Sequence, residues 1–453
     1  MNRRTAKIVR AVGAAAVVAV AATATGGVIL SDPTAAAYTD SATAVETTYT
    51  APAVYLAVSS QFTATSAALS GGYVWVWGYK GYGMSGNGQE TVSDESPKPV
   101  FGLRDVTKVV GASDLGETYG TFGALTEQGE VYTWGSNKLG RLGIGSTTGS
   151  RDYRATPQKV EFPDNERVID LGSMRATMAA LTESGKVYTW GSGQYGQAGN
   201  GSTSESRGPD APYLVMDNAH SMHVGQRLTW VVTRDNEVYW WGRSYQGENG
   251  AATVVNNPTP ELVTQMAPFA VGCEGPAIAV DDPADTCGIQ TITSSRQAGA
   301  LITAAGEVYT FGNRAEGQIG RPASNTAEAR EIKQVELPAA VHQISAGNYH
   351  FTALDETGTV WGWGDNASWQ ASGNIRPNGQ TGQGQTDATA PIRLPLRDII
   401  AVGGSRDTSY ATRADSVLIG WGSTSEGAIS GSTERRATFT PLVLPGIRVT
   451  EVY

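Results

Sequence analysis

The sequence predicts an all-β protein, a seven-bladed β-propeller of four-stranded blades in one closed ring. Three observations favour this fold class: a segment that recurs seven times, a strand-like run closed by glycine in each copy, and a similar spacing between copies. The clearest copy is LTEQGEVYTWGSNKLGRLG, from Leu125 to Gly143. Repetition of one supersecondary unit at a regular period is typical of propellers and solenoids, in which each unit packs on its neighbours.

Within this copy, a turn is followed by a short run of β-branched and aromatic residues. The turn is Glu127–Gly129, and the run is Val131–Trp134, closed by Gly135. This pattern indicates a strand entered through a hairpin. Other copies start at Leu181, Val232, Ile302 and Leu354, with weaker ones at Leu69 and Thr412.

Neither face of the predicted strand is strongly polar. Alternate side chains of a strand lie on opposite faces, so Tyr132 and Trp134 share one side and Val131 and Thr133 the other. Both faces are therefore expected to be covered, as in blades packed face to face around an axis. We expect the tryptophans of this strand in three copies to be buried: Trp134, Trp190 and Trp421.

The period is measured at the glycine that follows each aromatic residue. Successive glycines are 57, 56, 51, 70, 52 and 58 residues apart, a length that suits a four-stranded blade with a long loop. Residues 445–452 resemble the opening strand of a further repeat. We expect this C-terminal strand to close the ring by pairing into the first blade, because an exposed edge is then removed. Val54–Val58 could occupy the same position.

Residues 1–44 are expected to form an export segment with a linker, ahead of a propeller domain at 45–453. Four basic residues precede the uncharged run Ala11–Leu30, and small residues at 35–37 predict signal cleavage after Ala37. We expect a secreted protein rather than a retained anchor, because alanine and glycine contribute little to membrane spanning. Without cleavage, the segment would tether the protein at the cell surface.

The chain is acidic, with a formal net charge of −10. Removal of the basic export segment makes the charge −13. A nucleic-acid partner is therefore not expected, because the phosphate backbone would be repelled. The acidity is interpreted as a solubility feature of an exported protein.

The longest step between copies contains an insertion, expected at 264–291. It is bracketed by the only two cysteines of the chain, Cys273 and Cys287. In an exported protein this arrangement predicts a disulfide, which would stabilise a loop of this size by about 3 kcal/mol. Asp281, Asp282 and Asp285 lie inside the loop and are expected to form a solvated acidic turn rather than a calcium site.

No catalytic motif is found in the sequence. The G-x-S-x-G, H-E-x-x-H, phosphate-loop and EF-hand patterns are absent. We expect His220 and His223 to be solvent or turn histidines, since no third metal ligand lies near them. The sequence thus predicts no catalytic residue, no metal and no cofactor.

The repeat resembles that of the regulator of chromosome condensation family. The resemblance rests on Ala-Leu-Thr-x-x-Gly-x-Val-Tyr-x-Trp-Gly, then Gly-Gln-x-Gly and Pro-x-x-Val. It implies a seven-bladed propeller in which motif glycines such as Gly191, Gly196 and Gly199 are structural. In the family, a histidine in the place of His350 packs or hydrogen-bonds within its blade.

The same family contains a nuclear guanine-nucleotide exchange factor, ubiquitin-ligase modules and secreted bacterial binding proteins, including a propeller inhibitor of β-lactamases. The nuclear role is incompatible with an exported acidic protein. The repeat motif does not carry the functional residues of the exchange factor, so none is transferred to this chain.

Aromatic residues recur in the loop after the reference glycine and are the candidate binding residues. In a ring, equivalent positions share one rim, and tyrosine and tryptophan are common interface anchors. The alternative is that each aromatic ring packs against the neighbouring blade. The candidates are Tyr79, Tyr82, Tyr195, Tyr245 and Trp369.

The sequence therefore predicts an exported, monomeric, non-enzymatic scaffold that presents propeller loops to a protein or a cell-surface polymer. One form of this function is inhibition of a secreted enzyme. The alternative is a polysaccharide-active or lyase-type enzyme with its site at the central opening. Two or more carboxylates with raised pKa values at that opening would favour the enzyme.

Overall fold

The computed structural model describes most of residues 54–442. The described ranges are 54–55, 65–70, 72–79, 81–89, 93–113, 120–145, 152–204, 208–280, 282, 285–374, 387–415, 417–423 and 436–442. The chain divides into two units, Met1–Ala51 and Pro52–Tyr453, and the described residues belong to the second. The predicted export segment with its cleavage site at Ala37, and the predicted closing strand at 445–452, lie outside the described residues.

The described strands form seven antiparallel sheets, each made of four strands that are consecutive in the sequence. Sheet 1 contains β1 (Val54–Tyr55), β2 (Thr65–Ser70), β3 (Tyr73–Tyr79) and β4 (Ser93–Pro99). Sheet 2 contains β5 (Val106–Ser113), β6 (Gly120–Thr126), β7 (Val131–Ser136) and β8 (Tyr153–Val160). Sheet 3 contains β9 (Val168–Met174), β10 (Thr177–Thr182), β11 (Val187–Gly191) and β12 (Tyr213–Met216).

The remaining sheets repeat this meander. Sheet 4 contains β13 (Ala219–Val224), β14 (Leu228–Thr233), β15 (Val238–Arg243) and β16 (Asn256–Leu262). Sheet 5 contains β17 (Ile289–Ser294), β18 (Ala298–Thr303), β19 (Val308–Gly312) and β20 (Lys333–Val335). Sheet 6 contains β21 (Val341–Ala346), β22 (His350–Asp355), β23 (Val360–Gly364) and β24 (Ala388–Arg393). Sheet 7 contains β25 (Ile399–Ser405), β26 (Thr408–Arg413), β27 (Leu418–Ser423) and β28 (Arg436–Leu442).

The described helices are short and lie in connections. They are η1 (Lys138–Gly140), η2 (Pro163–Asn165), η3 (Thr264–Met266) and α1 (Thr326–Arg330). None of these helices is long and apolar enough to cross a membrane.

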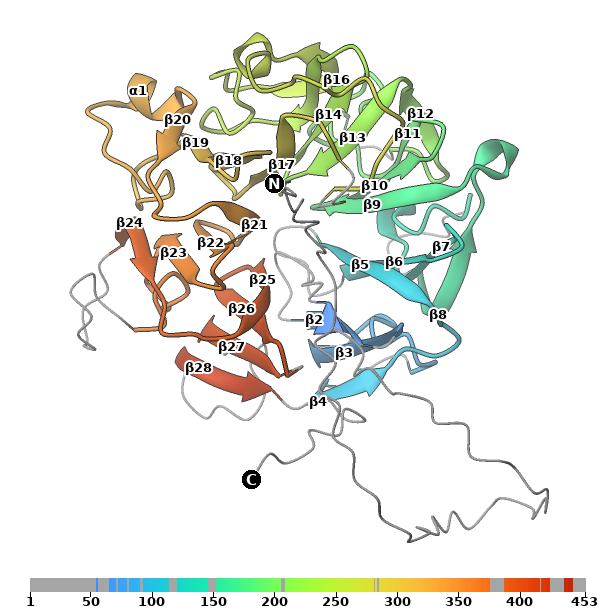
Figure 1. The fold of residues 1–453 in the computed structure, drawn as a ribbon. Helices are drawn as coiled ribbons and strands as arrows, with labels where there is room; N and C mark the ends of the chain where they lie inside the picture. Colours follow the sequence, from blue (N-terminus) through green and yellow to red (C-terminus); the bar gives the residue numbers. More distant parts are fainter. Residues whose placement is uncertain are drawn as a thin grey trace, which may run out of the picture. The chain divides into compact units, whose positions relative to one another are not determined.

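The sheets are arranged around a central axis, with the first strands of sheets 2 to 7 innermost (Figure 1). From sheet 2 to sheet 7, the first strand of each sheet contacts the first strand of the next. Sheets 7 and 1 meet where Tyr410 packs edge-on against Trp77, at 6.5 Å between ring centroids. The prediction of an all-β propeller is confirmed. Six sheets are complete blades, whereas β1 in sheet 1 has only two residues.

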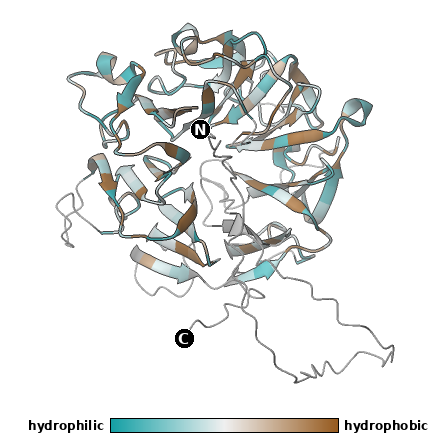
Figure 2. Cartoon of the chain, in the orientation of Figure 1, coloured by the Kyte–Doolittle hydropathy of each residue, from teal (hydrophilic) through white to brown (hydrophobic). Residues whose placement is uncertain are grey.

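The hydrophobic core lies between neighbouring sheets. Hydrophobic residues are concentrated on the strands in Figure 2, and the second strands of sheets 2 to 5 are buried along their whole length. Trp134, Trp190 and Trp421 are fully buried. The sequence-based prediction that these tryptophans belong to the core is therefore correct.

Tryptophans at this position connect five of the sheets to the preceding one by a hydrogen bond. The indole Nε1 of Trp190, in sheet 3, donates to the carbonyl oxygen of Arg141, in the loop of sheet 2, at 3.1 Å. Phe311 occupies this place in sheet 5 and has no donor. The other four bonds of this kind are Trp134 to Met84, Trp241 to Gln197, Trp363 to Gln318 and Trp421 to Gln370, at 2.9–3.1 Å.

The motif glycines are structural, as the sequence predicts. Gly191, Gly196 and Gly199 all have positive φ, which L side chains rarely adopt. Gly196 has φ +84°, and a Cβ there would lie 2.5 Å from the carbonyl oxygen of Asn257 in β16 of the next sheet. The glycine therefore allows the loop of one sheet to touch the outer strand of the next.

His350 is buried, and its partner lies in a different sheet from the one predicted. Its Nε2 is 2.8 Å from the hydroxyl oxygen of Ser409 in β26. That hydroxyl donates to the carbonyl of Gln370 at 2.8 Å, so the imidazole is the donor to Ser409. A Cβ on Gly347 would overlap the imidazole, which explains the glycine of the Gly-x-x-His pattern. The interaction joins sheets 6 and 7 rather than lying within one blade.

The insertion between β16 and β17 is closed by the predicted disulfide, Cys273–Cys287. The loop is tied to sheet 4, because Asn236 accepts a hydrogen bond from the backbone N–H of Cys273 at 2.9 Å. Asp285 accepts hydrogen bonds from the N–H of Cys287 at 2.8 Å and from Nε2 of His220 at 2.9 Å. The prediction of a solvated turn is therefore wrong for Asp285, while Asp281 lies outside the described residues.

The prediction for the two neighbouring histidines is also wrong. His220 and His223 are buried in β13 rather than exposed in a turn. Their burial arises because the insertion and β17 cover this strand: the N–H of Ile278 donates to the carbonyl of His220, and the N–H of Ile292 donates to Nδ1 of His223.

We predict that Gly196→Ala destabilises the fold by about 3 kcal/mol, combining left-handed backbone strain with overlap against Asn257. Gly201→Ala is the matched control, because Gly201 has φ +82° but nothing within 4 Å of the added Cβ. The free energy of unfolding of the control should fall by about 1 kcal/mol, because only left-handed backbone strain is added. Urea denaturation measures both values, and equal losses would show that contact with β16 is unimportant.

We predict that burial of His350 makes stability depend on pH. Burial lowers the pKa of His350 from 6.5 to about 3. The unfolded chain therefore gains a proton below the ordinary histidine pKa, while the folded chain does not until the pH is much lower. Stability from this residue is full above pH ~6.5 and falls by about 2 kcal/mol at pH ~5.

In His350→Gln, which keeps an amide donor for Ser409, the drop in unfolding free energy between pH ~7.5 and pH ~5 should be smaller by about 2 kcal/mol. Denaturant titrations of both proteins at the two pH values provide the measurement. Identical drops in the two proteins would contradict the assignment.

Candidate functional site

One face of the propeller carries two kinds of connection. These are the short turns between the first and second strands, described in sheets 3 to 7, and the longer loops between the third and fourth strands, described in full in sheets 4 and 5 and in part in sheets 1, 2, 3 and 6. Both emerge on the same side because successive antiparallel strands alternate in direction. We call this side the loop face. The second-to-third hairpins and the connections between sheets, including the disulfide-closed insertion, lie on the opposite side.

The structure places the predicted aromatic residues on the loop face but brings only two of them together. Tyr195 follows β11, Tyr245 follows β15, and Tyr245 is 36% exposed. Tyr82 packs edge-on against Tyr153 of the next sheet, at 6.2 Å between centroids, so for this residue the packing alternative holds. Trp369 is partly buried and has φ +68° where other copies have glycine. The side chain of Tyr79, at the end of β3, lies outside the described residues.

Tyr195 and Tyr245 belong to an alternating stack of guanidinium groups and phenol rings. The guanidinium of Arg243 lies 4.2 Å from the ring centroid of Tyr195 and 4.1 Å from that of Tyr245. Arg175 lies 4.6 Å from the Tyr195 ring, and Arg227 lies 5.1 Å from the Tyr245 ring. We call Arg175, Tyr195, Arg243, Tyr245 and Arg227 the arginine–tyrosine ladder. Its contacts are within cation–π range.

The repeat motif itself holds the two tyrosines in place. The buried side chain of Gln197 accepts a hydrogen bond from the N–H of Tyr195 at 2.7 Å. The equivalent Glu248 accepts from the N–H groups of Tyr245 and Gln246, each at 2.6 Å. The motif glutamine thus fixes the conformation of the loop that carries the aromatic residue.

Arg227 is a nearly buried cation within a group of arginines. Its side chain is 2% exposed, and its Nε and Nη2 make no hydrogen bond to a described residue. The pKa of Arg227 is lowered to about 10, mainly by burial and also by the charges of Arg296, Arg175 and Arg243, with Glu248 acting in the opposite direction. Four guanidinium groups therefore lie close together on the loop face of an acidic protein.

A second part of the loop face is acidic. Burial raises the pKa values of Glu316, Asp387 and Asp407, and the negative charge of Asp365 raises each of them as well. These four residues come from sheets 5, 6 and 7, and we call them the acidic group. The loop face thus has a basic region on sheets 3 to 5 beside an acidic one on sheets 5 to 7.

The central opening contains a cavity of 280 Å³ lined by the first strands of sheets 2 to 6. Asp170 is the only carboxylate among its described lining residues, and it is paired with Lys108. Val280 of the insertion also lines the cavity. A second carboxylate, which the enzyme alternative requires, is not among these residues.

Ser221 and His223 approach within hydrogen-bond distance but cannot act as a nucleophile and its base. The Nδ1 of His223 accepts from the N–H of Ile292 at 3.2 Å, so Nε2 carries the proton. Nε2 lies 2.9 Å from the Ser221 hydroxyl and donates to it. Burial lowers the pKa of His223 to about 3. The pair is a buried structural hydrogen bond.

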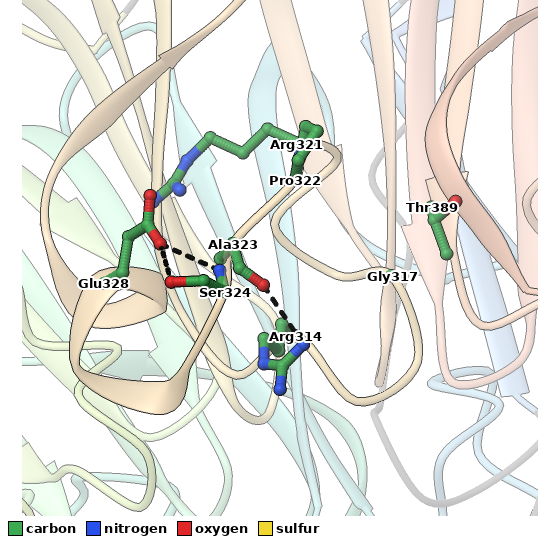
Figure 3. Close-up of a pocket in the computed structure, with 8 residues that line it drawn as sticks. All are labelled: Arg314, Gly317, Arg321, Pro322, Ala323, Ser324, Glu328 and Thr389. Carbon is green, nitrogen blue, oxygen red and sulfur yellow. Dashed lines mark hydrogen bonds between the residues drawn. The ribbon is translucent and has the colours of Figure 1, made fainter.

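A larger hollow of 540 Å³ lies in the loop between β19 and β20 of sheet 5, beside α1, with Thr389 of sheet 6 at its edge (Figure 3). Its polar groups mostly bond to residues of sheet 5 and this loop. Arg314 donates to the carbonyl of Ala323 at 3.1 Å, and Arg321 donates to three backbone carbonyls. Hydrogen bonds from Ser324 lower the pKa of Glu328 to about 2. These contacts fold the loop around α1, so this hollow is a weaker candidate site than the ladder.

Sequence reasoning did not identify the arginines of the ladder. The usable signal is positional: an arginine recurs in the turn between the first and second strands of four sheets, at Arg175, Arg227, Arg296 and Arg406. The candidate binding residues predicted from the sequence all lie in the loops after the third strands, whereas these arginines lie in the turns before the second strands. Among the described residues, no group of three or more His, Cys, Asp or Glu side chains is arranged to hold a metal ion.

Comparison with known proteins identifies the repeats. A family model for the regulator of chromosome condensation (RCC1) repeat matches residues 128–173 and 184–229, and a second model of the same description matches 341–368. The human E3 ubiquitin-protein ligase HERC2 is 34% identical over 197 residues, which cover 42% of this chain and 4% of HERC2.

Two comparisons with yeast extend over more of the chain. The guanine nucleotide exchange factor SRM1 of Saccharomyces cerevisiae is 23% identical over 255 residues, covering 53% of this chain and 50% of SRM1. The crystal structure of Prp20p from the same yeast superposes with a TM-score of 0.62 at 17% identity, covering 85% of this chain and 86% of Prp20p. That likeness shows the fold. The repeat matches show that the chain contains RCC1 repeats at residues 128–173, 184–229 and 341–368.

Proposed function

We propose that this protein is an exported, monomeric, non-enzymatic scaffold, a seven-bladed ring that binds a protein partner on its loop face. The observation that carries this proposal is the arginine–tyrosine ladder, which spans the loops of sheets 3 and 4. Tyrosine and arginine are enriched among residues that dominate binding energy at protein interfaces.

The ladder is ordered before any partner arrives. Arg243 is held between two phenol rings, and the backbone of each tyrosine is bonded to a buried motif side chain. Ordering a flexible surface side chain on binding costs free energy, so a surface that is already ordered binds more tightly. A closed ring of sheets adds to this effect by restricting the loops.

Similar proteins support a protein partner rather than a small substrate. Prp20p was described together with its binding to Gsp1p and histones, and SRM1 is a guanine nucleotide exchange factor. The exported character of this chain favours a different, extracellular partner. A rigid face that covers the active site of a secreted enzyme would act as an inhibitor, which is the specific form of binding that we propose.

Export is supported by two independent features. The N-terminal segment has the basic, apolar and small-residue regions of a signal peptide. The disulfide Cys273–Cys287 is of a type that persists in oxidising compartments.

We predict that the double substitution Tyr195→Ala and Tyr245→Ala abolishes partner capture, because both phenol rings of the ladder are removed. The affinity-tagged protein is incubated with culture medium and envelope extract of the producing cell, and captured proteins are quantified by mass spectrometry. The matched control is Tyr213→Ala, since Tyr213 is a 44% exposed tyrosine on the outer strand β12.

Capture by the wild type and the control, but not by the double variant, supports binding at the loop face. The melting temperature of the double variant must equal that of the wild type. Equal capture by all three proteins would place the site elsewhere. Absence of any captured protein would contradict a protein partner and direct the search to glycan arrays.

We predict that the protein recovered from the medium begins at Tyr38, because cleavage is expected after Ala37. Intact-mass measurement of the secreted form tests this directly. Recovery of the chain with residues 1–37 intact, in the membrane fraction, would instead identify a tethered surface protein.

A further inference from the structure

We propose that the arginine–tyrosine ladder, together with Arg296, is a carboxylate-recognition site that binds an acidic segment of the partner protein. This inference rests on the proposed function, because it specifies the chemistry of binding at the same face. It also explains why cations cluster on one region of a protein whose net charge is −10.

The geometry leaves guanidinium donors available for a ligand. The guanidinium of Arg243 lies over the rings of Tyr195 and Tyr245, and its three side-chain nitrogens make no hydrogen bond to a described residue. The guanidinium of Arg296 lies 5.6 Å from the ring centroid of Tyr349 and likewise donates no hydrogen bond to a described residue. A guanidinium stacked on aromatic rings keeps its in-plane N–H groups free, and these match the two oxygens of a carboxylate.

The charge balance of the region favours an anion. Arg227, at one end of the ladder, is nearly buried, and its Nε and Nη2 are not hydrogen-bonded to any described residue. The nearby carboxylate of Glu248 is also buried and already accepts two backbone hydrogen bonds. Among the described residues, the four guanidinium groups therefore outnumber the two neighbouring carboxylates, Glu248 and the Glu316 that interacts with Arg296. A bound anion would lower the electrostatic energy of a desolvated cation.

The same face selects against a long polyanion. The acidic group, Glu316, Asp365, Asp387 and Asp407, lies beside the basic region, and the chain as a whole is negative. A nucleic acid or sulfated polysaccharide extending across the face would meet these carboxylates and be repelled. A folded partner can instead place acidic side chains on the ladder and basic ones on the acidic group. Such complementary pairing is common at protein interfaces.

The test measures binding of a fluorescein-labelled hexaglutamate peptide to the full-length protein by fluorescence anisotropy, at low and near-physiological salt. We expect binding that weakens with salt. Arg243→Gln and Arg296→Gln should each weaken it at least about tenfold, the size expected for a lost hydrogen bond to a charged group. Arg243→Lys keeps the charge but loses the planar stack, and should be intermediate.

Arg314→Gln is the matched control, because it removes the same charge from an exposed arginine in the hollow beside α1. The affinity of Arg314→Gln for the hexaglutamate peptide should differ from that of the wild type by less than about twofold. Peptide affinities are compared only between variants whose melting temperature equals that of the wild type. If Arg243→Gln is unstable, Arg243→Lys takes its place in the comparison. Equal weakening by Arg314→Gln, or no peptide binding at low salt, would overturn the proposal.

Two further outcomes separate this inference from the proposed function. If Arg243→Gln still captures the partner that the tyrosine double variant loses, the carboxylate site is wrong while the binding face stands. If a heparin hexasaccharide displaces the peptide and binds more tightly, with the same dependence on Arg243 and Arg296, the site recognises a sulfated polymer and the acidic-protein assignment is overturned.

Discussion

The hydrogen bond from a buried indole to the loop of the preceding sheet is the constraint on which the rest of this structure depends. A tryptophan Nε1 deep in a hydrophobic core must find an acceptor, because an unsatisfied buried donor costs about 1–3 kcal/mol. Trp190 finds it in the carbonyl of Arg141, outside its own sheet, and four other tryptophans do the same. Sheets that pack through side chains alone could slide, whereas this bond specifies how neighbours align.

The acceptor carbonyls belong to the loops that carry the candidate binding residues, so the fold and the site share one mechanism. The carbonyl of Gln197 accepts the indole of Trp241, while its side chain accepts the N–H of Tyr195. One residue thus joins the core of sheet 4 to the surface loop of sheet 3. The ladder forms where Tyr195 meets Arg243, which follows Trp241 along β15. Core packing therefore sets the spacing of the stacked side chains.

Local sequence patterns predicted the parts of the structure that depend on one repeat, and failed where neighbouring repeats meet. The strand predicted at Val131–Trp134, the burial of Trp134 and Trp190 and the disulfide all follow from composition and spacing within a unit. His220 and His223 were misassigned because their burial comes from the insertion and β17, which lie far along the chain. Similarly, the partner of His350 is Ser409 of the next sheet. The ladder combines residues from two turns and two loops, so no single window of sequence contains it.

The net charge of the chain describes its average behaviour and not the potential at the loop face. Charges separated by more than a Debye length, about 8 Å at physiological salt, are largely screened from each other. The basic region around Arg227 and the acidic group around Asp365 come from different sheets, so they can contact two parts of one partner. A face of this kind selects both the charge pattern of a partner and the orientation in which it binds. Rotating the partner would bring like charges together. A rigid propeller holds its charged groups at fixed positions and can therefore orient a partner, whereas a flexible acidic tail cannot. The division of charge between neighbouring sheets, rather than the total charge, is consequently the property that determines which surfaces this protein can bind.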